Sequence, residues 1–224
     1  MASNLDLQEQ EQLDELKAFW NRYGNLITWT LTLVLAAFAA WNGWNWWERQ
    51  QSAKASAMFE EFDRALQGGN AEQAGRVFND LKDRYGRTTY AQQAGLLAAK
   101  LQADKSQADA AQASLTWVAE QGKDEEYQAM ARLRLAGLLL DKKAYDEALK
   151  QLDAVKSPEF VPLADDRRGD VLLASGKRDD AVKAFQSAWK AMNEKIDYRR
   201  VIEAKLTSLG AAPEPAAAAS GVAS

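Results

Sequence analysis

The chain has 224 residues, with 28 lysines and arginines against 32 aspartates and glutamates, and it contains neither histidine nor cysteine. Without those two residue types, disulfides, thiol nucleophiles, Ser-His and Cys-His catalytic pairs and the usual zinc sites are excluded. A net charge of −4 gives no electrostatic footprint for nucleic acid. Because the chain is rich in alanine and has only 4 prolines, its composition favours helices over sheets.

Residues 1–22 form an acidic segment with an amphipathic end. Leu13, Leu16, Trp20 and Tyr23 recur at steps of three and four residues, which places them on one face of a helix. Such a face is typical of a helix that lies at the membrane–water interface.

Residues 23–47 carry no charged side chain and are predicted to form a transmembrane helix. These 25 residues would extend over about 37 Å as a helix, against about 30 Å for the hydrocarbon core of a bilayer. Six of the eight tryptophans lie between Trp20 and Trp47, at the two ends of the apolar stretch, where aromatic belts form. At the second end, Trp41, Trp44 and Trp47 are candidate contacts for a membrane partner.

Two alternatives to a permanent anchor are a buried core helix and a cleaved signal peptide, for which Ala37-Phe38-Ala39 has the required form. Tryptophans at both ends fit a core poorly, and a long acidic segment is unlike the short basic start of a signal peptide. An uncleaved anchor is therefore the preferred interpretation. Two basic residues before the span and three in the next twenty leave its orientation open on charge alone.

Residues 48–209 are predicted to form a tetratricopeptide-repeat-like α-solenoid, so that the fold class is all-α with one N-terminal transmembrane helix. Small residues recur with spacings of 37, 37 and 33, and a large apolar residue follows each after four positions. The small residues are Ala74, Ala111, Ala148 and Ala181, and the large ones are Phe78, Leu115, Leu152 and Phe185. Phe62 occupies a position where a small residue is expected, which predicts a distorted first repeat. The competing explanation is a chance pattern in an alanine-rich chain.

The first helices of such repeats line a concave face, which is suited to holding an extended or unfolded polypeptide. The positions expected to be exposed on it are Phe59, Leu66, Leu96, Met130, Leu133, Leu140, Leu163 and Leu173, with Asp63, Asp166 and Asp170 among them. Alternatively, some of these residues pack on neighbouring helices, or the last helix, residues 197–209, fills the groove.

Two further features concern the end of the chain. Arg168 precedes Gly169 where a leucine is usual, and a partly buried guanidinium needs a carboxylate, so we expect an ion pair with an acid such as Asp165. Residues 210–224 are rich in Ala, Pro, Ser and Gly and are predicted to be a flexible tail. No residue is a candidate for catalysis, cofactor binding or metal binding, and the protein is predicted not to be an enzyme.

Two stretches carry a resemblance to a known family: residues 16–25, LKAFWNRYGN, before the span, and residues 163–177, LADDRRGDVLLASGK, in the last repeat. Together with the single span and the four repeats, they resemble the YfgM family of ancillary Sec-translocon subunits. The resemblance implies a bacterial inner-membrane protein with a cytoplasmic N-terminus and a periplasmic repeat domain. It also implies association with the SecYEG channel and the periplasmic chaperone PpiD, in support of the traffic of exported proteins.

The preferred hypothesis is therefore a non-enzymatic translocon accessory whose groove contacts a chaperone or an exported chain. A second hypothesis is a membrane-tethered regulator whose acidic N-terminal segment sequesters a cytoplasmic signalling protein. A third is a scaffold for assembly of the cell envelope.

Overall fold

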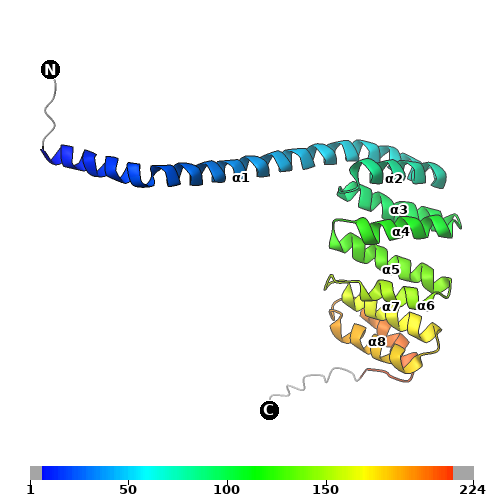
Figure 1. The fold of residues 1–224 in the computed structure, drawn as a ribbon. Helices are drawn as coiled ribbons and strands as arrows, with labels where there is room; N and C mark the ends of the chain where they lie inside the picture. The colour runs from blue at the N-terminus through cyan, green and yellow to red at the C-terminus, as the bar shows by residue number, and fades with distance from the viewer. Residues whose placement is uncertain (1–6, 214–224) are drawn as a thin grey trace, which may run out of the picture. The chain divides into compact units, whose positions relative to one another are not determined.

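The structure is a computed structural model that describes residues 7–213, with side chains described from residue 11 onward. All regular secondary structure in this range is helical, which confirms the all-α class. The helices are α1 Leu7–Gln67, α2 Ala71–Tyr85, α3 Thr89–Asp104, α4 Ala108–Gln121, α5 Glu125–Asp141, α6 Tyr145–Asp153, α7 Val161–Ala174, α8 Arg178–Ala191 and α9 Arg199–Ser208 (Figure 1). The chain divides into two compact units between Gln51 and Ser52, within α1.

In the first unit, α1 is long and apolar enough to cross a membrane, and only 6% of its most apolar window is buried, unlike the core helix of a soluble protein. The threonine side chains of this stretch bond to their own helix. The hydroxyls of Thr28, Thr30 and Thr32 each donate to the carbonyl four residues earlier at 2.8 Å. Internal satisfaction of polar groups is what a hydrocarbon environment requires. The predicted boundaries at residues 22 and 47 fall inside this helix, where no break in the backbone marks them.

The second unit contains the predicted helix pairs. The end of α1 pairs with α2, then α3 with α4, α5 with α6, and α7 with α8, and these helices follow one another in chain order (Figure 1). We number the pairs as repeats one to four. A ninth helix, α9, follows the fourth repeat, and of the predicted tail the part from residue 214 onward lies outside the described residues.

The turn inside each repeat has the same geometry. Its central residue has a positive φ of 63° at Gly69, 59° at Ser106, 59° at Lys143 and 82° at Gly176. The next amide in every turn donates to a carbonyl five residues back, as when Asn70 N bonds to Ala65 O at 3.0 Å. This is the left-handed cap that ends many helices, and it recurs with the spacings 37, 37 and 33 of the sequence period. The turns therefore confirm the repeat period through a feature other than hydrophobicity.

The predicted small and large positions lie in the interior. Ala74, Ala111, Ala148 and Ala181 are fully buried, and Phe78, Leu115, Leu152 and Phe185 are nearly so. A small side chain lets the two helices of a pair approach, and the large residue one turn later fills the space beside it. The repeated spacing of small and large residues therefore reflects how the helices pack, and it is not a chance effect of the alanine content.

Phe62 and Gly169 occupy equivalent positions on the first helices of repeats one and four. The Phe62 ring is fully buried in a cluster with Ala74 and Phe78, so the first repeat accommodates a large residue there. At Gly169, by contrast, a Cβ atom would overlap the ring of Phe185. The fourth repeat consequently depends on the absence of a side chain at residue 169.

Three hydrophobic clusters make up the core of the second unit. One lies in repeat one and α3, a larger one extends from α3 to α7, and the third joins α8 to α9 around Phe185 and Ile202. Trp117 packs against the first two clusters and contacts the Phe78 ring edge-on, with 5.4 Å between ring centroids. The core is thus continuous along the first three repeats.

The close approach at Gly169 yields a stability prediction. Gly169→Ala should lower the free energy of unfolding by about 1–3 kcal/mol, because its methyl group overpacks against Phe185. In the matched variant Gly137→Ala, the methyl group meets nothing within 4 Å inside α5 and should raise stability by about 0.5–1 kcal/mol. Thermal unfolding of both full-length variants in detergent, followed by circular dichroism, checks this. Equal shifts of the two midpoints would contradict the packing argument.

Candidate protein-interaction sites

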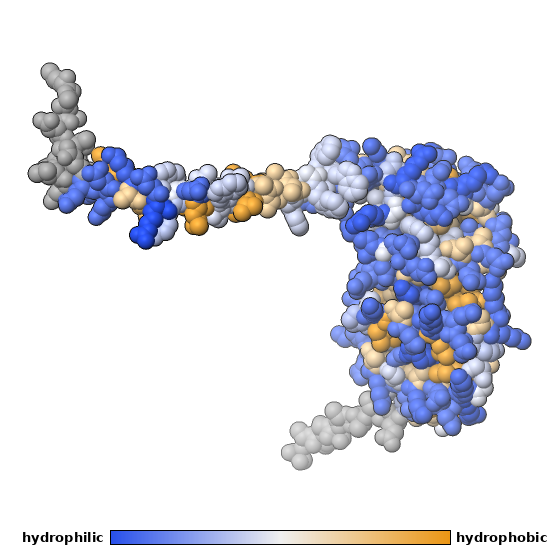
Figure 2. Space-filling view, viewed as in Figure 1, coloured by the Kyte–Doolittle hydropathy of each residue, from blue (hydrophilic) through white to orange (hydrophobic). Residues whose placement is uncertain are grey.

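The first candidate surface is the aromatic end of the apolar stretch of α1. Trp41, Trp44 and Trp47 are all exposed, with 69%, 54% and 42% of their surface accessible, and the rings of Trp44 and Trp47 lie 5.4 Å apart. Near the other end, the rings of Phe19 and Tyr23 are 5.1 Å apart. Orange apolar side chains mark the middle of α1 in Figure 2. The helix therefore presents a wholly exposed surface of large apolar residues, as lipid or a membrane partner requires.

The second candidate surface is the row of apolar residues on the first helices of the repeats. Phe59, Met130, Leu133 and Leu140 are half-buried and pack against the clusters below them, and Figure 2 shows apolar side chains among polar ones on the face in view. The Phe59 ring contacts Phe62 and Tyr90, with ring centroids 5.5 and 5.6 Å away. These residues form a partly covered apolar surface and not a bare groove.

Two residues expected on this surface are buried instead. Leu96 is 5% exposed, because α5 packs over it: Arg134 Nη1 donates to the Leu96 carbonyl at 3.1 Å. Asp166 is 2% exposed, because α9 covers it. The expectation that both lie open to a partner is wrong.

Asp166 is the buried member of a partly exposed charge cluster between α7 and α9. Lys205 Nζ lies 2.8 Å from a carboxylate oxygen of Asp166 and 2.8 Å from one of Asp170. The Tyr198 hydroxyl donates to the same Asp166 carboxylate at 2.8 Å. Burial, reinforced by the hydrogen bond and charge of Asp166, raises the pKa of Tyr198 to about 12. The last helix therefore occupies the face of the fourth repeat, as one alternative from the sequence proposed.

The expected ion pair of Arg168 is present. Its guanidinium bonds to Asp165 on the same helix and to Asp153 on α6, at 2.8 Å from the latter. The Ser187 hydroxyl donates to the second oxygen of Asp165 at 2.7 Å, which links α7 to α8. Arg168 thus ties α6 to α7 and has a structural role.

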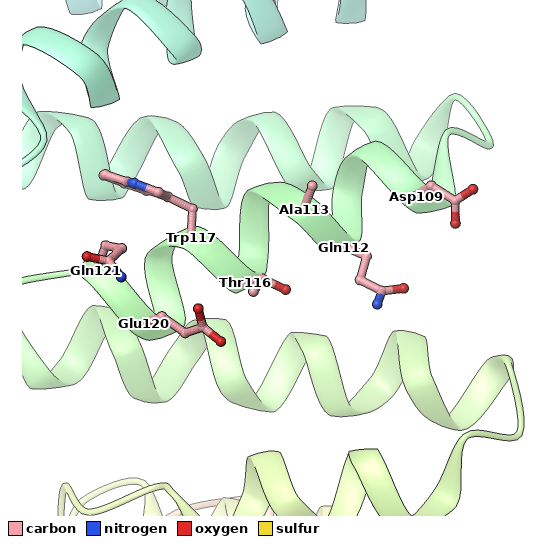
Figure 3. A pocket seen from close by; sticks show the side chains of 7 residues that line it. All are labelled: Asp109, Gln112, Ala113, Thr116, Trp117, Glu120 and Gln121. Carbon is pink, nitrogen blue, oxygen red and sulfur yellow. The ribbon is translucent and has the colours of Figure 1, made fainter.

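Sequence reasoning missed a third surface, an open pocket of about 460 Å³ along one face of α4 (Figure 3). It is lined by Asp109, Gln112, Ala113, Thr116, Trp117, Glu120 and Gln121. Lys142 bonds to the rim residue Asp109 at 2.7 Å, and this hydrogen bond and charge lower the Asp109 carboxyl pKa. The steps of three and four residues were visible in the sequence, but the face is mostly polar and so gave no hydrophobic signal. Within the described residues, no cluster of three or more acidic side chains could hold a metal ion.

The chain is similar in sequence to a known domain family and to known proteins. A profile of the tetratricopeptide repeat-like domain matches residues 17–211. An ancillary SecYEG translocon subunit of Neisseria gonorrhoeae is 31% identical over 204 residues, which cover 91% of this chain and 98% of the relative. The chain belongs to the YfgM family.

Other relatives of the same name are more distant. The ancillary SecYEG translocon subunit of Aggregatibacter actinomycetemcomitans is 26% identical over 91% of this chain and 98% of its own length. That of Escherichia coli is 27% identical over 82% of this chain and 86% of its own length. The repeat-like fold shared across the YfgM family fits a non-catalytic scaffold.

The charge cluster at Lys205 predicts a large effect on stability. Lys205→Met should lower the free energy of unfolding by about 3 kcal/mol, because it leaves the buried Asp166 and its neighbour Asp170 without their cation. The matched variant Lys183→Met removes only an exposed pair with Asp180 and should change stability by no more than about 0.5 kcal/mol. Thermal unfolding of the full-length variants measures both effects, and similar losses from the two would refute a special role for Lys205.

Tyr198 predicts a dependence of stability on high pH. Its folded-state pKa lies above the ordinary value of 10.0, so its contribution is fully present below about pH 10 and is lost as the pH rises towards 12. The stability difference between the natural chain and Tyr198→Phe should therefore shrink across this range. Thermal unfolding of both proteins at several pH values checks it. A difference that stays constant from neutral pH to pH 12 would show that the phenol does not titrate in this way.

Proposed function

We propose that this protein is a non-catalytic, single-span ancillary subunit of the Sec translocon in the bacterial inner membrane. In this proposal its N-terminus lies in the cytoplasm and its repeat domain in the periplasm. The span contacts the SecYEG channel, and the repeat domain contacts a periplasmic chaperone such as PpiD or an exported polypeptide. The observation that carries the proposal is the match to a translocon subunit over 98% of that relative's length, so that span and repeats are both included.

The exposed surface of α1 supports contact with channel helices. The threonine hydroxyls of the span are satisfied within the helix, and its tryptophans are exposed. Helices associate in membranes through packing, because lipid offers no hydrophobic driving force between them. Trp41, Trp44 and Trp47 supply large rings for such packing at one end of the span, and we assign channel contact to them.

The half-buried apolar residues of the first helices support contact with a protein partner in the periplasm. Phe59, Met130, Leu133 and Leu140 present apolar surface that the fold leaves partly uncovered. Aromatic and methionine side chains are enriched where proteins bind one another. Leu96 and Asp166 leave the proposed contact set because they are buried, and Asp170 leaves it because Lys205 holds it.

Site-specific crosslinking in cells tests the proposal. A photoreactive residue replacing Trp44 should capture a channel subunit, and one replacing Leu133 should capture the chaperone or an exported chain. The same residue at Lys190, which is exposed on α8, provides the control and should capture neither. Protease added to spheroplasts should digest the repeat domain if it is periplasmic. Capture of neither partner, or a repeat domain digested only after the membrane is permeabilised, would refute the proposal.

A further inference from the structure

A partly open pocket of about 330 Å³ lies at one edge of the third repeat. It is bounded by the start of α5 and by the segment of residues 154–157 that follows α6. Its charged lining consists of Lys123, Arg132 and Lys156 on the basic side and Glu125 on the acidic side. The pocket is therefore predominantly basic, in a chain whose net charge is negative.

Arg132 is held between two helices by neutral groups. Its Nη2 donates to the Ala119 carbonyl of α4 at 2.7 Å, and its Nη1 contacts Gln151 Oε1 of α6 at 3.3 Å. The third donor, Nε, is buried and has no hydrogen-bond partner, and among the described residues it is the one buried side-chain polar atom in that condition. An orphaned donor of this kind costs about 1–3 kcal/mol.

The positive charge of Arg132 also lacks a counterion. No carboxylate forms an ion pair with it in the part of the chain that the structure describes. The carbonyl ends of α4 and α6 supply only partial negative charge, and they leave Nε unbonded. A guanidinium that is partly removed from water is stable when a carboxylate or a similar anion accepts from it. In this pocket no side chain of the described residues fills that role.

We propose that this pocket binds a carboxylate group carried by a peptide. The carboxylate accepts from Nε of Arg132, Lys156 at the pocket wall adds a second positive charge, and the largely buried Ser157 adds a hydroxyl. The carboxylate belongs to an aspartate or glutamate side chain or to a peptide C-terminus. The pocket is thus a second recognition site on the repeat domain, independent of the half-buried apolar residues and of the proposed function.

A carboxylate fits this lining better than phosphate. Two of the three nitrogens of Arg132 already donate a hydrogen bond, so Nε is the one nitrogen left without a partner, and a dianion would meet the Glu125 carboxylate in the pocket lining. A planar, singly charged group needs fewer donors and suffers less repulsion. To reach the buried Nε, the ligand must displace the guanidinium slightly, and the 3.3 Å contact with Gln151 is the weaker of its two anchors.

Titration of the full-length chain in detergent micelles, followed by the Nε–H resonances of its arginines, tests the site. The probes are acetyl-Gly-Asp-Gly-amide, its neutral Asn counterpart, acetyl-Gly-Gly with a free C-terminus, and inorganic phosphate. The Arg132 signal is identified by its loss in Arg132→Lys. The aspartyl peptide or the free C-terminus should shift this signal saturably, and which of the two does so identifies the source of the carboxylate.

Three further variants keep the test decisive if Arg132→Lys does not fold. Gln151→Glu places a carboxylate 3.3 Å from Arg132 within the fold, so it should pair with the guanidinium and abolish the response. Lys156→Gln should weaken binding about tenfold, whereas Lys150→Gln, which removes an exposed charge outside the pocket, should leave it unchanged. An equal response to the Asn peptide, binding of phosphate alone, or unaltered binding in Gln151→Glu would each overturn the proposal, as would no saturable shift.

Discussion

The close approach of two helices at a small residue determines the geometry of the repeat domain. Ala74, Ala111, Ala148 and Ala181 mark that contact once in every repeat, and each is fully buried. Where the approach is closest, there is no room for a side chain: a Cβ atom on Gly95 would come within about 3 Å of Val118 and Phe78, as one on Gly169 would overlap Phe185. Because each pair buries only one stripe of side chains, it needs its neighbours to complete a core, and the array is stable only as a stack.

At the end of such a stack, the last helix pair has no neighbouring repeat, so its apolar face would be exposed to solvent unless another element covers it. Here α9 supplies the cover, with Ile202 and Leu206 fully buried against Phe185. The same helix brings Lys205 to the Asp166 and Asp170 carboxylates. Burying carboxylates without a cation would be strongly unfavourable, so the helix must bring charge as well as apolar surface. Even with this cover, the most exposed large apolar side chains of the repeat domain lie at this end of the stack, and they are Leu173, Ile196, Tyr198 and Val201.

Features that depend on neighbouring residues, such as the helix pairs, can be predicted from the sequence. The burial of a side chain by a helix distant in the sequence cannot. The spacing of small and large residues gives the helix pairs, and Arg168 with Asp165 three positions earlier gives an ion pair, because both signals lie within one or two turns of helix. Leu96 was wrongly predicted to be exposed, because helical periodicity indicates which residues share a face of a helix but does not indicate which other helix packs on that face. Asp166 was misplaced because Lys205, its cation, lies 39 residues later. The left-handed turn at Lys143 carries no glycine to mark it in the sequence, so it is recognised only in the structure, from its positive φ and its hydrogen bonds.

The two units satisfy their polar groups in different ways, and this difference bears on how each can bind. In the apolar stretch of α1, the hydroxyls of Thr28 and Thr32 donate to carbonyls of their own helix. A partner helix would therefore bind this stretch mainly through van der Waals packing. In the repeats, polar side chains bond across helices, as when Gln92 Nε2 donates to Asp124 at 2.9 Å while the Asp124 amide donates back. When every polar side chain is bonded in this way, no buried donor or acceptor remains for a ligand. Arg132 is the exception among the described residues, because its Nε is the one buried side-chain polar atom without a hydrogen bond, and the proposed carboxylate site is placed there for that reason.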